Sequence, residues 1–311
     1  MPTIASVSLD RPLEEIADEL GRSFAETGFG VVRDHGIPAD LIARAWAMCR
    51  AFFALPEEVK RQYRLAGKGG ARGYTPFGTE QAKDATVIDL KEFWHVGRTL
   101  PPGDPLEQFM APNVWPSEVP GFRETMEEIY AAFEASGQRI LEAIALSLGE
   151  APDFFAASVD KGNSVMRLLH YPPLAAANGS AAPEGAIRAA AHEDINTITL
   201  LLGAEESGLQ LKTAEDEWIW VAPPEGALVV NIGDMLQRLT NGHLRSTSHR
   251  VMNPVGEAAQ RPRYSMPFFL HFRPDFLIEP MAKFVDSQHP PLPPITAEEY
   301  LQQRLREIKL T

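Results

Sequence analysis

Two histidines and one aspartate have the types and spacing that could bind a metal ion. His192 and Asp194 are separated by one residue and directly precede the apolar run NTITLLL, and His249 lies in STSHRV. Two imidazoles and one carboxylate, without a thiolate, form a ligand set that Fe(II) or Zn(II) accepts while leaving positions open for other molecules. The pattern therefore predicts a metal site at His192, Asp194 and His249.

A simpler interpretation stays open at this point. Residues two apart on a strand point to the same face, so the side chains of His192 and Asp194 would converge. Asp194 could then accept only a hydrogen bond from His192. His243 is a rival third ligand, although the surrounding TNGH is typical of a turn.

Arg263 and Ser265 form a second pair with the same spacing, in the run RYSMPFF. A guanidinium with a hydroxyl beside it is suited to holding a carboxylate. The alternative is an edge strand that leaves Arg263 in solvent. The pair therefore predicts an anchor for an organic acid if the strand is an inner one.

Short strand-like runs occupy the second half of the chain and would position these residues. They are separated by Gly, Pro, Asn and Asp, and no strong helix interrupts them, which favours an antiparallel sandwich or barrel over alternating strands and helices. The runs cover residues 164–171, 196–202, 208–213, 217–222, 227–233, 247–252 and 263–272.

Helices are expected to flank this β core. Asp10 is expected to cap a first helix, and Pro38 to open a second that ends at Leu55. The clearest apolar stripe spans 120–149, and Thr296 with Glu299 forms a capping box for a last helix through about Ile308. We therefore expect one domain over 1–311, with a largely helical part at 1–160, the metal-binding core at 161–280 and a C-terminal helix at 281–311.

Composition narrows the class of protein. The 311 residues carry a net charge of -13 and no basic cluster, which argues against a nucleic-acid or anionic-membrane partner. The single cysteine, Cys49, excludes a disulfide framework or a cysteine-based zinc site and is expected in a helical core. No leader-like or membrane-spanning run is visible, so a cytoplasmic protein is expected.

Taken together, the motifs resemble the isopenicillin N synthase-like branch of the iron(II)/2-oxoglutarate-dependent oxygenases. The resemblance carries the metal ligands onto His192, Asp194 and His249, and the cosubstrate carboxylate anchor onto Arg263 and Ser265, with Tyr171 as an adjacent hydroxyl donor. Leu169 departs from the family, which often has Asn there. The similar segments are GFGVVRDHGIP, GYTPFGTE, DLKEFWHVG, VMRLLHYPP, HEDINTITLLL, SGLQL, NIGDMLQRLTNG, STSHRV and RYSMPFF.

The resemblance implies a fold and a reaction. The fold would be a distorted double-stranded β-helix, or jelly roll, flanked by helices. The reaction would use Fe(II), 2-oxoglutarate and O2 to hydroxylate or desaturate a small organic substrate, releasing succinate and CO2. The alternative is an oxidase or cyclase like isopenicillin N synthase, which uses no 2-oxoglutarate and has a C-terminal glutamine near the iron. Gln302 and Gln303 lie in a charged helical stretch and give that alternative little support.

Two segments are expected to face the substrate, namely residues 68–78 and 93–98. Arg98 could bind a substrate carboxylate or lie in solvent. Phe268 and Phe269 are expected in the core rather than against the substrate. The sequence predicts neither the substrate nor the oligomeric state.

Overall fold

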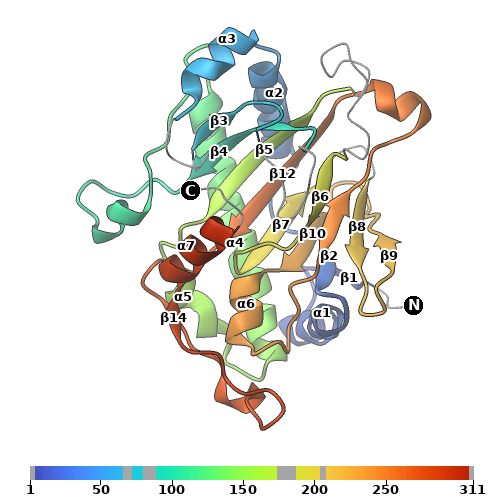
Figure 1. Ribbon diagram of the computed structural model, residues 1–311, viewed down its shortest axis with the longest axis vertical. Helices are drawn as coiled ribbons and strands as arrows, with labels where there is room; N and C mark the ends of the chain where they lie inside the picture. The colour runs from blue at the N-terminus through green and yellow to red at the C-terminus, as the bar shows by residue number, and fades with distance from the viewer. Residues whose placement is uncertain (1–3, 66–71, 80–88, 174–186, 204–207, 308–311) are drawn as a thin grey trace.

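Two β-sheets pack face to face and form the centre of the protein (Figure 1). The computed structural model describes residues 4–65, 72–79, 89–173, 187–203 and 208–307. An apolar cluster between the sheets joins Phe29 and Val229 of the larger sheet to Ala189, Leu211 and Val251 of the smaller one. The predicted β core is therefore built from strands of both halves of the chain.

The larger sheet has eight strands in the order β1-β2-β10-β7-β12-β5-β4-β3. Only β1 and β2 pair in parallel, and the other neighbours are antiparallel. The strands are β1 (Ser6–Ser8), β2 (Phe29–Arg33), β10 (Leu228–Ile232), β7 (Ile198–Leu202), β12 (Arg263–Leu270), β5 (Val165–Tyr171), β4 (Glu92–Gly97) and β3 (Gly73–Thr75).

The smaller sheet has four antiparallel strands in the order β6-β11-β8-β9. It carries the segment around each predicted histidine ligand. The strands are β6 (Ala189–His192), β11 (His249–Val251), β8 (Leu209–Lys212) and β9 (Trp218–Trp220). A separate hairpin-like pair joins β13 (Leu277–Ile278) to β14 (Ile295–Thr296).

Helices cover the outer face of the larger sheet, with α4 running behind it in Figure 1. A Cβ atom at Gly137 of α4 would lie 2.4 Å from the end of the Leu270 side chain, so a larger residue would displace Leu270 where this helix crosses β12. The helices are α1 (Leu13–Thr27), α2 (Ala39–Phe53), α3 (Glu57–Lys60), α4 (Phe122–Ser147), α5 (Ala156–Val159), α6 (Asp234–Leu239) and α7 (Ala297–Glu307).

Strand alternation separates the core from the inner face of the larger sheet. On β12, Phe268 and Leu270 are buried in the helix-side core, where Phe268 stacks on Phe133 with ring centroids 5.3 Å apart. Arg263 and Ser265 belong to the opposite set of alternating residues on the same strand. Polar groups on that set face the smaller sheet, whereas Met266, Phe268 and Leu270 of β12 lie in the apolar helix-side cluster.

The predicted arrangement of an antiparallel core with flanking helices is confirmed, while several helix boundaries differ. The helix expected over 120–149 spans Phe122–Ser147. The C-terminal helix expected over 281–311 occupies only Ala297–Glu307 of the described residues, because β14 precedes it. Pro12 precedes α1 without any side-chain cap, so the predicted role of Asp10 is wrong, and α2 ends at Phe53 rather than Leu55. The capping box is confirmed, because Thr296 Oγ1 accepts from the amide of Glu299 at 3.2 Å. Residue 308 lies outside the described residues.

Cys49 lies fully buried in the core on α2, as predicted. Burial raises the pKa of its thiol well above the usual range. Among the described residues, no helix combines the length and the apolar character that a membrane span requires.

Candidate active site

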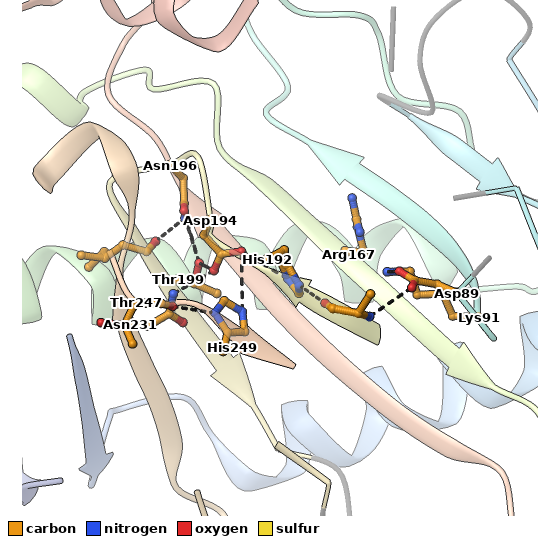
Figure 2. A network of polar contacts seen from close by, with 12 residues as sticks. Asp89, Lys91, Arg167, His192, Asp194, Asn196, Thr199, Asn231, Thr247 and His249 are labelled. Carbon is orange, nitrogen blue, oxygen red and sulfur yellow. Dashed lines mark hydrogen bonds and ion pairs between the residues drawn. The ribbon is translucent and has the colours of Figure 1, made fainter. Parts of the chain in front are cut away.

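The side chains of His192, Asp194 and His249 converge on one point between the two sheets (Figure 2). Their ligand atoms all lie within 4.8 Å of one another. Nε2 of each imidazole is 3.9 Å from Oδ1 of Asp194, which is too long for a hydrogen bond. The simpler interpretation, in which Asp194 only accepts a hydrogen bond from His192, therefore does not describe this arrangement.

Backbone pairing brings the two histidines together from distant parts of the sequence. β6 and β11 are neighbours in the smaller sheet, and His192 is registered opposite His249. The ring centroids are 4.4 Å apart. Asp194 lies two residues beyond the end of β6, so the strand alternation used in the sequence analysis is wrong for this residue. The loop before β7 turns its carboxylate toward the imidazoles instead.

The outer nitrogen of each ring is held by a backbone carbonyl. Nδ1 of His192 lies 2.7 Å from the carbonyl oxygen of Ala190, and Nδ1 of His249 lies 3.1 Å from that of Thr247. A neutral imidazole that donates from Nδ1 presents the lone pair of Nε2 on its other side. Both rings are thus oriented as metal ligands need to be.

Asp194 is held in the same way through its second oxygen. Oδ2 accepts hydrogen bonds from Thr199 Oγ1 at 2.5 Å and from Asn231 Nδ2 at 2.8 Å. Burial alone would raise the pKa of Asp194, but the two facing imidazoles and these donors lower it. The carboxylate is therefore ionised near neutral pH, with Oδ1 directed toward the histidines.

The electrostatic surroundings also favour a neutral His192. Burial among protein groups and the neighbouring His249 lower the pKa of His192 to about 4, although one edge of its side chain remains open to solvent. Metal ligation requires a neutral imidazole. Two neutral nitrogens and one carboxylate oxygen without a thiolate suit Fe(II), so the residues present fit the metal that the predicted family uses.

The predicted carboxylate anchor lies on two adjacent strands of the larger sheet. Arg263 on β12 is registered opposite Tyr171 on β5, and its Cζ is 5.0 Å from the centroid of the tyrosine ring. Nη1 of Arg263 donates to Ser265 Oγ at 3.2 Å. All three side chains are buried, which rules out the alternative of Arg263 on a solvent-exposed edge.

Sequence reasoning missed a second arginine beside this anchor. Arg188 is fully buried, and its Cζ lies 5.8 Å from the ring centroid of Tyr171. It precedes β6, whose sequence shows only small residues before His192. Two guanidinium groups therefore flank one tyrosine ring, and the only signal in the sequence was an isolated arginine after an Ala/Gly/Pro-rich stretch.

Two family models match the chain. Residues 2–118 match the N-terminal region described as "non-haem dioxygenase in morphine synthesis", and residues 162–272 match the 2OG-Fe(II) oxygenase superfamily. The 2-oxoglutarate-dependent dioxygenase citB of Monascus ruber is 34% identical over 300 residues, covering 93% of this chain and 88% of that protein. The chain belongs to the 2OG-Fe(II) oxygenase superfamily.

Solved structures of similar proteins agree with the fold. A 2OG-Fe(II) oxygenase family protein from Caulobacter crescentus is 50% identical, with a TM-score of 0.90 and coverage of 99% of this chain and all of that one. A Neurospora crassa protein, solved with alpha-KG and thymine, is 29% identical, with a TM-score of 0.84 and coverage of 97% and 96%. The predicted double-stranded β-helix core flanked by helices is confirmed.

Membership in the superfamily establishes the type of chemistry. The protein is an Fe(II)- and 2-oxoglutarate-dependent oxygenase, and its cofactors are Fe(II) and 2-oxoglutarate. Its partners are 2-oxoglutarate, O2 and a small-molecule substrate. The alternative of an oxidase without 2-oxoglutarate has no support in α7, where Gln302 and Gln303 bond to Glu298 and Glu307 on the same helix.

Several other predicted residues occupy places that the sequence did not reveal. Arg98 is neither in solvent nor in a position to bind substrate, because it pairs with Glu134 of α4 and donates to the carbonyl of Gly162 at 2.8 Å. His243 stacks on Phe284 instead of joining the metal ligands. Residues 68–71 of the first predicted substrate-facing segment lie outside the described residues.

Proposed function

We propose that His192, Asp194 and His249 hold the Fe(II) of this oxygenase and that Arg263, Ser265 and Tyr171 bind the distal carboxylate of 2-oxoglutarate. The enzyme would hydroxylate or desaturate a small organic substrate and release succinate and CO2. The observation that carries the proposal is the placement of both Nε2 atoms 3.9 Å from Asp194 Oδ1. The atoms on the far side of the three groups, Nδ1 of each imidazole and Oδ2 of Asp194, are already hydrogen-bonded to the protein.

The bound iron would supply the activation of O2 by oxidative decarboxylation of 2-oxoglutarate. The protein's own residues orient the reactants. Thr199 and Asn231 fix the carboxylate plane of Asp194, and the carbonyls of Ala190 and Thr247 fix the imidazole rings. Arg263 with Ser265 would set the position of the cosubstrate relative to the ligands, because a guanidinium binds a carboxylate through a forked pair of hydrogen bonds.

A polar and aromatic surface on β4 and β5 supports a substrate site on the inner face. Arg167 lies four residues before Tyr171 on β5, so strand alternation places it on the same face as the anchor. Its guanidinium lies 4.3 Å from the ring centroid of Phe93 and 5.4 Å from that of Phe269, and its Nε donates to His95 Nε2 at 2.5 Å. We assign Arg167, His95, Phe93 and Phe269 to the substrate side. Only Phe268 thus keeps the core position expected for both phenylalanines, since Phe269 is half-buried on the opposite face of β12.

Solved relatives act on, or were solved with, small organic molecules. The Neurospora crassa protein was solved with thymine, and a rice relative is a dioxygenase for auxin oxidation. These names and the cationic and aromatic groups around Arg167 support a planar or acidic small molecule as the substrate of this chain.

The remaining expectations are also proposals. Strands β1 to β4 lie in the same sheet as the strands of the metal-binding core, which supports a single domain over 1–311. The net charge of -13 supports an enzyme without a nucleic-acid or anionic-membrane partner, and the single cysteine supports a reducing, cytoplasmic location.

The decisive experiment measures O2 consumption and succinate with Fe(II), with and without 2-oxoglutarate, across a library of small organic acids and heterocycles. We expect succinate to form only with Fe(II) and 2-oxoglutarate, and to increase with a true substrate. The His249→Ala variant should form none. O2 consumption that is coupled to substrate oxidation without 2-oxoglutarate would overturn the proposal in favour of the oxidase.

A further inference from the structure

His192 is the least enclosed of the three proposed ligands. Its side chain is 38% exposed, compared with 10% for His249 and 7% for Asp194. It ends β6, a four-residue strand at the edge of the smaller sheet, whereas His249 lies on an inner strand and packs edge-to-face against Phe29. The orientation of His192 must therefore depend on what covers the outer edge of β6.

The segment just before β4 covers that edge. The amide of Leu90 donates to the carbonyl of Ile187 at 3.4 Å, and the amide of Ala190 donates to Asp89 Oδ1 at 3.1 Å. The second oxygen of Asp89 forms a 2.8 Å ion pair with Lys91, and both side chains are buried. The carboxylate of Asp89, just before β4 of the larger sheet, thus takes the place of the neighbouring strand that β6 lacks.

Ala190 connects this carboxylate to the metal ligand. Its amide is held by Asp89, and its carbonyl, 2.7 Å from Nδ1, holds the ring of His192. Figure 2 shows the series running from Lys91 and Asp89 through this backbone to His192. A buried carboxylate therefore lies two hydrogen bonds from the imidazole, through the backbone of Ala190.

We propose that Asp89, with Lys91 as its buried counter-ion, is a positioning residue for the metal centre, acting through Ala190 on the tautomer and direction of the His192 ring. The inference rests on the proposed assignment of His192 as an iron ligand. The side chain of Asp89 contributes a hydrogen-bond acceptor at its Oδ1, and Lys91 offsets the cost of burying that carboxylate.

Two double variants separate the acceptor from the charge. Asp89→Asn with Lys91→Met keeps an oxygen for the Ala190 amide and leaves no buried ammonium ion unpaired. Asp89→Ala with Lys91→Met removes the acceptor as well. Co(II), which reports its ligands through its visible spectrum, is titrated into each metal-free protein under anaerobic conditions.

We expect the alanine variant to bind Co(II) roughly 10–100-fold more weakly than wild type, with an altered visible spectrum, because losing an outer partner of a ligating histidine has effects of this size. The asparagine variant should keep the wild-type affinity and spectrum. Equal Co(II) affinity in the two variants would overturn the proposal. If the alanine variant does not fold, a tenfold loss of affinity in the asparagine variant would overturn it.

A matched control lies one residue further along the chain. Glu92 forms a buried 2.7 Å ion pair with Lys60 on the opposite, helix-side face of β4. Glu92→Gln with Lys60→Met should lower the midpoint of thermal unfolding but leave the Co(II) affinity unchanged. If this control also binds Co(II) more weakly, the loss of affinity in the Asp89 variants comes from a general loss of stability. If wild type binds no Co(II), or His192→Ala binds it as tightly, the metal assignment itself fails, and this inference with it.

Discussion

Thr199 donates a 2.5 Å hydrogen bond to Oδ2 of Asp194 from the larger sheet, although the two residues belong to different structural elements. Thr199 lies on β7, and Asp194 lies in the loop that precedes this strand. Asn231 on the neighbouring strand β10 donates to the same oxygen. The larger sheet therefore fixes the carboxylate, while the smaller sheet supplies the imidazoles.

Replacing Thr199 by valine should weaken the metal site. The change removes one of two donors to Asp194 Oδ2 while keeping nearly the same volume, so we expect roughly 10-fold weaker Fe(II) binding. Anaerobic titration of the metal-free protein measures it. Thr197→Val is the matched control, because Thr197 is fully buried two residues away and its hydroxyl has no hydrogen-bond partner among the described residues. An equal loss of affinity in both variants would refute the role of Thr199.

The anchor for 2-oxoglutarate can be tested at Arg263. In Arg263→Met the distal carboxylate loses charge-assisted hydrogen bonds of about 1.5–3 kcal/mol, so the Kd for 2-oxoglutarate should rise roughly 10–100-fold. The weak visible band of the anaerobic Fe(II)–2-oxoglutarate complex measures this Kd.

Arg98→Met serves as the control for that variant. It breaks the ion pair with Glu134 on α4, so the midpoint of thermal unfolding should fall. The Kd for 2-oxoglutarate should stay at the wild-type value. If Arg98→Met weakens 2-oxoglutarate binding as much as Arg263→Met does, the anchor has been assigned to the wrong residue.

His271 should make the metal-free protein less stable in acid. Burial lowers the pKa of His271 to about 4, compared with about 6.5 in an unfolded chain. The unfolded state therefore binds the proton first, and the stabilisation, complete above pH 6.5, is lost as the pH falls toward 4. His271→Asn keeps a donor for the carbonyl of Phe269, which lies 3.0 Å from Nδ1.

Urea unfolding at pH 7 and pH 4.5 measures this effect. Between these two values wild type should lose about 2–3 kcal/mol more free energy of unfolding than His271→Asn. His289→Asn, on an exposed side chain, should behave as wild type. The same pH dependence in wild type and His271→Asn would show that His271 is not the source.

The proposed substrate side predicts that Arg167 affects succinate formation in the presence of substrate but not in its absence. In Arg167→Met the anchor and the metal ligands are unchanged, so succinate formation without substrate should continue at the wild-type rate. Substrate-stimulated succinate formation should require substrate concentrations about 10-fold higher or more, because a charged hydrogen-bonding group has been removed from the substrate surface. An unchanged KM for the substrate identified by the library screen would place the substrate elsewhere.

The three residues proposed as metal ligands could be singled out from the sequence, and the structure brings their ligand atoms within 4.8 Å of one another. His192 and His249 needed only to be brought together by pairing between strands, which the apolar runs already indicated. The strand geometry assumed for Asp194 was nevertheless wrong, since a strand boundary two residues away cannot be located from apolar pattern alone.

The groups that orient the ligands could not be predicted in the same way. Thr199 and Asn231 are ordinary residues of apolar strands, and only the register between β7 and β10 turns both toward Asp194. Asp89 and Ala190 are 101 residues apart in the sequence, so no local pattern connects them. Arg98 looked like a surface or substrate residue because its partner, Glu134, lies on the distant helix α4.

The proposed imidazole ligands and the proposed substrate-side residues lie on different sheets, and this separation has an evolutionary consequence. The proposed imidazole ligands lie on β6 and β11, whereas Arg167 and its aromatic neighbours lie on β4, β5 and β12. Side chains in the second group can change without altering the strands that carry the imidazoles. A lineage can therefore acquire new specificities around Arg167 while purifying selection preserves both those strands and the larger-sheet residues Thr199 and Asn231 that hold Asp194.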